Sequence, residues 1–117
     1  MARRQALLEC AFLIPIRRDR NLSDGRLHRT DAWTWLREGL FQFRGATEAK
    51  ELYTGWYVDA DTEKRVADLS RKYYVALPRG EIGRLRSLLR QACHVFRQKS
   101  IYLSIAGRVE FIEGTLQ

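Results

Sequence analysis

Four of the five tyrosines stand where alternate side chains of predicted strands share one face. Residues Glu51–Asp59 and Leu69–Leu77 are rich in aromatic and β-branched side chains, which is typical of strands, and the polar stretch 60–68 joins them. The four tyrosines are Tyr53, Tyr57, Tyr74 and Tyr102. Such a face can be a homodimer interface, the floor of a small-molecule cleft, or a platform on which bases stack. We favour the homodimer interface, and the cleft after it.

Base stacking can be tested against the RNA-recognition motif, which places several aromatic side chains on one strand. Within residues 71–77, Tyr74 falls where a stacking ring is required, but Lys72 stands at the other aromatic position. The first predicted strand offers Leu13 rather than a ring on that face. We therefore do not expect an RNA-recognition motif. Binding of nucleic acid through charge, without sequence preference, stays an alternative function.

A second set of chemically capable residues lies in a basic segment, Arg17–Arg29, that precedes a predicted helix. The beginning of a helix attracts anions, and arginine side chains around it strengthen that attraction. We predict that this loop, at the rim of the open sheet face, binds a small anionic ligand or a partner. Its candidate residues are Arg17, Arg18, Arg20 and His28. The competing interpretation is a solvated basic loop, which most charge runs are.

Catalytic and metal-binding patterns are missing from the sequence. There is no nucleophile elbow and no closely spaced histidine pair. Asp59, Asp61 and Glu63 resemble the start of a calcium loop, but Lys64 and Ser70 occupy its glycine and distal glutamate positions. We therefore predict no catalytic residue, no metal and no cofactor. A small dimeric enzyme that uses His28 or His94 remains an alternative, by analogy of fold.

The elements that would position these residues follow in a β-α-β-β-α-β order. Helical spacing predicts a helix from Thr30 to about Phe43, and a second from about Gly80 to Phe96. The remaining strands are predicted at Leu8–Ile16, Ser100–Ile105 and Arg108–Ile112. This order predicts one α+β, ferredoxin-like domain over residues 1–117, with both helices on one face and a C-terminal hairpin extension. The strand positions predicted to face the helices are Phe12, Ile14, Trp56, Val58, Tyr73, Val75, Leu77, Ile101, Leu103 and Ile105.

The composition fits a small folded protein with a basic surface. The chain has 117 residues, is 45% hydrophobic and carries a formal charge of +7, with arginine at all but four of its 21 basic positions. Coding bias towards arginine would explain this excess without a function. No apolar run approaches the length of a membrane span, and Glu9 interrupts the N-terminal one, so we predict a cytoplasmic location.

Several short motifs resemble those of a loose group of small proteins. That group has a helix ending in Phe-Gly-Gly-x-Thr, a Gly-x-Trp strand, and a helix ending in Phe-x-Gln before its last strand. The corresponding residues here are 43–47, with Arg44 in place of the first glycine, then 55–57 and 96–98. The resemblance implies a ferredoxin-like fold and assigns no active site.

Together these observations predict a non-catalytic, homodimeric binding module. Its binding surface would be the tyrosine-rich open sheet face with the basic loop at the rim, and it would not associate with membranes.

Overall fold

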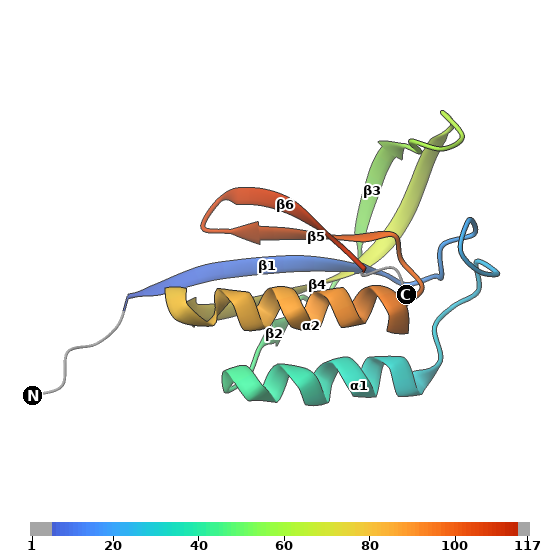
Figure 1. Ribbon diagram of the computed structural model, residues 1–117. Helices are drawn as coiled ribbons and strands as arrows, with labels where there is room; N and C mark the ends of the chain where they lie inside the picture. The colour runs from blue at the N-terminus through green and yellow to red at the C-terminus, as the bar shows by residue number, and fades with distance from the viewer. Residues whose placement is uncertain (1–5, 115–117) are drawn as a thin grey trace, which may run out of the picture.

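The computed structural model describes residues 6–114, which form two helices and six strands (Figure 1). Two short 3-10 turns, Phe41–Phe43 and Arg79–Glu81, lie after the first helix and before the second. In chain order the main elements are β1 (Leu7–Pro15), α1 (Thr30–Leu40), β2 (Thr47–Glu48), β3 (Tyr53–Val58), β4 (Arg65–Pro78), α2 (Ile82–Val95), β5 (Ser100–Ile105) and β6 (Arg108–Glu113).

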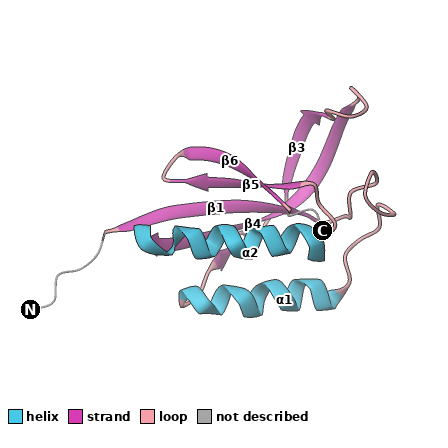
Figure 2. Ribbon diagram, viewed as in Figure 1, coloured by secondary structure: helices cyan, strands magenta, loops and turns pink. Residues whose placement is uncertain are grey.

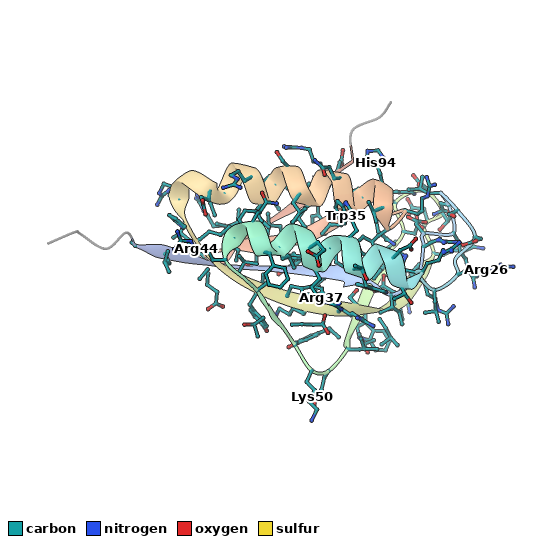
Figure 3. All side chains as sticks on the ribbon, turned by 90° about the horizontal axis from the view of Figure 1, so that it is seen from below. Arg26, Trp35, Arg37, Arg44, Lys50 and His94 are labelled. Carbon is teal, nitrogen blue, oxygen red and sulfur yellow. The ribbon has the colours of Figure 1, made fainter. Side chains whose placement is uncertain are left out.

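All the strands belong to one antiparallel sheet, and both helices lie on the same side of it (Figure 2). The strand order is β2-β4-β1-β5-β6, and β3 also pairs with β4. Seen from the helix side, α1 and α2 run next to each other in front of the sheet (Figure 3). The predicted α+β class, the two helices and the C-terminal hairpin are confirmed, and two helices on an antiparallel sheet are consistent with the predicted ferredoxin-like fold.

The core lies between the helices and the sheet. The predicted helix-facing positions on the long strands are buried, among them Phe12, Val75 and Leu103. They meet a helical stripe that includes Leu36 of α1 and Leu85 of α2, both fully buried. Burial of these apolar side chains is the main contribution to the stability of the fold.

Two predicted core residues, Trp56 and Val58, are instead largely exposed. Trp56 is 81% exposed and Val58 is 59% exposed. The prediction was wrong because strand alternation gives the face of a side chain but not how far the helices extend over the sheet. The β3–β4 hairpin projects beyond the helix layer, so neither helix of residues 6–114 covers this face of β3 (Figure 1).

The strand β4 is also longer than predicted. It begins at Arg65 rather than Leu69, so the predicted polar connection shrinks to a short turn after Val58. Residues Tyr53–Val58 pair with Arg65–Ser70 in continuous register. This extension places Asp68 on a strand instead of in a loop.

No helix within residues 6–114 is both long enough and apolar enough to cross a membrane.

Phe96 provides a test of the core. Its side chain is fully buried, and its ring lies 4.8 Å from that of His28 and 4.9 Å from that of Trp33, centroid to centroid. We expect Phe96→Ala to lower the free energy of unfolding by about 3–5 kcal/mol, because it removes a large apolar side chain and leaves a cavity. Urea unfolding measures this. The control is Leu22→Ala at an exposed position, with an expected change within about 0.5 kcal/mol. A Phe96 variant as stable as this control would contradict the described core.

Candidate functional site

A cavity of about 490 Å³ lies on the sheet face opposite the helices. Its floor is formed by the strands β1 and β4, with Leu13 and Ser70 among the lining residues, and the β3–β4 hairpin forms one wall. Four aromatic residues and four carboxylates also line it: Trp56, Tyr57, Tyr102, Phe111, Asp19, Asp59, Asp61 and Asp68. The size and the mixture of apolar walls with a few polar groups are those of a small-molecule site.

The tip of the hairpin is tied to both neighbouring loops. The Asn21 side-chain amide donates a hydrogen bond to the Asp59 carboxylate over 2.9 Å. On the other side, Lys99 forms a salt bridge with Asp61. Asn21 belongs to the segment after β1, and Lys99 to the segment before β5, so these contacts hold the hairpin over the cavity.

Asp68 and Tyr57 form the polar centre of this wall. Partial burial raises the pKa of Asp68, and a hydrogen bond from the Tyr57 hydroxyl opposes that rise. The pKa of Tyr57 is raised by its own burial and by the charge of Asp68. Gly55 faces Asp68 across the ladder, and a Cβ atom on Gly55 would lie only 3.1 Å from Asp68 Oδ1. A glycine at this position therefore leaves room for the carboxylate.

Tyr102 and Phe111 form the wall on the β5–β6 side. They face each other across the ladder, with ring centroids 5.9 Å apart and an edge-to-face angle of 78°. This is a favoured arrangement for aromatic pairs. It leaves Phe111 64% exposed, beside the cavity.

The other two tyrosines named from the sequence, Tyr53 and Tyr74, lie next to the cavity and do not line it. Their hydroxyl oxygens are 3.5 Å apart, and the Lys72 ammonium lies 4.9 Å and 5.2 Å from their two ring centroids. The hydrogen bond with Tyr53 and the nearby Lys72 lower the pKa of Tyr74. The predicted set of four tyrosines is thus divided into two neighbouring pairs on one sheet face.

The basic loop residues do not line this cavity. Arg18 forms a salt bridge of 2.9 Å with Asp24 and lines a separate hollow with His28 beside α1. Arg17 lines a neighbouring hollow together with Asp68, and the Arg20 side chain packs against Gly25. The anion site proposed for these residues stays a prediction. Among the helix arginines, Arg86 is occupied by a two-point contact with Glu110, over 2.7 Å and 3.1 Å.

His28 is a packed residue rather than an exposed one. Its Nε2 lies 2.7 Å from the Pro15 carbonyl oxygen, and its ring packs edge-on against Trp33 and Phe96. Its Nδ1 is buried without a hydrogen-bond partner among residues 6–114. Because a carbonyl oxygen can only accept, this contact requires the proton on Nε2.

The sequence-based choice of site residues missed Asp68, Asp19 and Phe111. One signal was present, because Asp68 stands directly before the predicted strand and is flanked by the apolar residues Val66, Ala67 and Leu69. Asp68 fell within the predicted polar connection 60–68, where an aspartate is expected, so it did not suggest a site. Asp19 and Phe111 line the cavity because segments far apart in the sequence meet there. The spacing of residues within one segment cannot predict such a meeting.

Comparison with known proteins gives a structural result only. No family model matches the chain, and no curated protein matches its sequence. A solved phage SAM lyase in complex with S-methyl-5'-thioadenosine has the same fold, with a TM-score of 0.68 and 14% identity over 97% of this chain and 95% of that chain. A phage SAM lyase in the apo state gives a TM-score of 0.63 and 16% identity over 100% and 98% of the two chains.

These neighbours overturn the prediction of a non-catalytic binding module. That prediction rested on the missing catalytic motifs, and the two proteins that share nearly the whole fold are enzymes. The reasoning failed because the absence of a familiar catalytic motif excludes only the enzyme families that carry that motif. An enzyme that binds and orients its substrate on a sheet face has no need of one.

The environment of His28 predicts a pH dependence of stability. Burial lowers its pKa below the ordinary 6.5, outweighing the hydrogen bond to Pro15. The unfolded state then binds the proton more readily, so the free energy of unfolding falls as the pH drops from 6.5 towards the lowered value. We expect His28→Phe to reduce this loss, measured by urea unfolding between pH 7 and pH 5. The control His94→Phe, at an exposed position on α2 (Figure 3), keeps the loss. An unchanged loss in His28→Phe would contradict this account.

Proposed function

We propose that this protein is a ferredoxin-like enzyme that cleaves S-adenosylmethionine and releases S-methyl-5'-thioadenosine. The observation that carries the proposal is the cavity on the open sheet face, with the half-buried Asp68 beside Tyr57 under an aromatic wall. The phage SAM lyases that share the fold support the choice of substrate. At their level of identity they establish a shared fold, so the activity of this chain needs its own test.

The cavity chemistry suits this substrate. A sulfonium ion carries a positive charge on a weakly hydrated centre, which aromatic faces and carboxylates attract. Tyr57 supplies an aromatic surface, and Asp68 supplies a negative charge in a partly desolvated place. An adenine ring can stack on the remaining aromatic side chains, Tyr102 and Phe111.

The reaction needs little from the protein beyond binding and orientation. Release of S-methyl-5'-thioadenosine breaks the bond between sulfur and the γ-carbon of the amino-acid part, and the bonding electrons leave with the now neutral sulfur. The substrate's own carboxylate can attack that carbon and close a five-membered lactone, with no proton gained or lost. A site that fixes the folded substrate in this geometry accelerates such a step by orientation. Asp68, its charge close to the sulfonium, would hold the substrate in place.

The variant Asp68→Asn tests this role. We expect kcat/KM for S-adenosylmethionine cleavage to fall about 10- to 100-fold, because a charged partner of the substrate is lost. Release of S-methyl-5'-thioadenosine, followed by liquid chromatography, measures the rate. The matched control is Glu38→Gln, which removes an exposed carboxylate on α1, across the sheet from the cavity. It should leave the rate unchanged. No cleavage by the unaltered protein would overturn the proposed function.

The pH profile provides a second test. The pKa of Asp68 is raised above its ordinary 3.8, so its carboxylate is lost at a higher pH than that of an exposed aspartate. Activity that depends on the carboxylate should therefore fall on acidification, with its midpoint above pH 3.8. This acid limb of the kcat/KM profile should disappear in Asp68→Asn. An acid limb that persists in the variant would show that another group controls it.

The homodimer also remains a proposal, and so does the cytoplasmic location. Exposed apolar side chains on the projecting hairpin, Trp56 and Val58, support self-association, because isolated monomers rarely expose such residues together. Light scattering at micromolar concentration tests it, and a monomer would contradict it.

A further inference from the structure

The cluster formed by Tyr53, Lys72 and Tyr74 lies beside the cavity, on the same sheet face. The Lys72 ammonium is held between two aromatic rings, with 4.9 Å to the Tyr53 centroid and 5.2 Å to that of Tyr74. Both distances are within the range of a cation–π contact. The two hydroxyl oxygens are 3.5 Å apart, and that of Tyr74 is within hydrogen-bonding reach of the Lys72 ammonium. The cluster therefore presents one fixed cation with hydroxyl groups around it.

The positive charge of Lys72 is not neutralised by a neighbouring carboxylate. Within residues 6–114, Lys72 forms no salt bridge, whereas the adjacent Arg71 reaches Glu48 on the other side of the strand. An aromatic ring holds an ammonium group in place but leaves its N–H donors available to an anion. The cluster is thus prepared to bind a negatively charged group.

Strand register connects this cluster to the cavity. Tyr53 is paired with Ser70, and Lys72 is paired with Leu13, and both of these partners line the cavity. Asp68 lies two residues before Ser70 on the same face of β4, which corresponds to about 7 Å along a strand. Tyr53 therefore lies one side-chain row beyond Asp68, and the Lys72 backbone lies two rows beyond it, about 13 Å along the strand, a span that the lysine side chain and the ligand must bridge together.

The substrate of the proposed reaction has a matching shape. Its sulfonium carries a short amino-acid arm that ends in a carboxylate and an ammonium group. A sulfonium beside Asp68 places this arm along β4, towards Lys72. We infer that the Tyr53–Lys72–Tyr74 cluster binds the α-carboxylate of this arm, an inference that rests on the proposed function. Lys72 would contact the carboxylate through its ammonium, and the tyrosines would fix the lysine and donate hydrogen bonds.

Ligands that differ only in this arm separate the cluster from the rest of the site. S-Methyl-5'-thioadenosine lacks the amino-acid arm, and S-adenosylhomocysteine retains it without a sulfonium charge. We expect Lys72→Met to weaken S-adenosylhomocysteine binding about 10- to 100-fold in calorimetric titration, because a charge-assisted contact is lost. Binding of S-methyl-5'-thioadenosine should change less than about twofold, and S-adenosylmethionine cleavage should fall with the loss of arm binding.

The matched control is Lys50→Met. Lys50 lies at the tip of the loop between β2 and β3 and points away from the sheet (Figure 3). This variant removes the same charge and should leave both affinities unchanged. Tyr53→Phe, which keeps the ring but removes one hydroxyl, should weaken S-adenosylhomocysteine binding by a smaller factor than Lys72→Met.

The outcomes distinguish this inference from the function on which it rests. If the unaltered protein cleaves S-adenosylmethionine and Lys72→Met binds both ligands normally, the cluster is not the carboxylate site and the function stands. Equal weakening of both ligands in Lys72→Met would also overturn the inference, because the loss would not depend on the arm. If the unaltered protein binds neither ligand and cleaves no S-adenosylmethionine, both proposals are wrong.

Discussion

The site depends on the length of a single strand. The C-terminal part of β4, from Ser70 onward, pairs with β1 above the helices, whereas Arg65–Leu69 pairs only with β3. A two-stranded ribbon twists more strongly than a wide sheet. The free part of the hairpin therefore leaves the plane of the sheet on the side away from the helices (Figure 1). That departure creates a concave surface on a sheet face that would otherwise be flat and open to solvent.

The β3–β4 hairpin partly buries Asp68 and also places it at the cavity. Partial burial of Asp68 disfavours its charged form. The ionised carboxylate therefore lowers the free energy of unfolding. The same partial desolvation would strengthen its attraction for the cationic substrate of the proposed reaction. The contacts from Asn21 and Lys99 stabilise the hairpin in the position where Asp68 and Tyr57 meet the cavity. Stability of the domain itself comes from the opposite face, where Phe12, Leu85 and Phe96 are buried.

Local pattern predicted much of the fold and only part of the site. Helical and strand periodicity identified both helices and the buried face of the long strands, because these depend on which side chains avoid water. The same alternation placed Tyr57 and Tyr102 on the open face, where they line the cavity. It placed Trp56 in the core, since it carries no information on where the helix layer ends. Asp68 and Phe111 come together only through the bend of the hairpin, which is a property of the whole sheet.

The most direct measurement of the central claim is an NMR titration of the ¹⁵N-labelled protein with S-methyl-5'-thioadenosine. If the open sheet face is the ligand site, the backbone amide signals of Gly55, Asp68, Ser70 and Tyr102 should shift together and saturate. The signals of Glu38 and Gly83 on the helix layer should stay in place. Shifts confined to the helix side of the sheet, or no saturable shift at millimolar ligand, would contradict the assignment of this face as the active site.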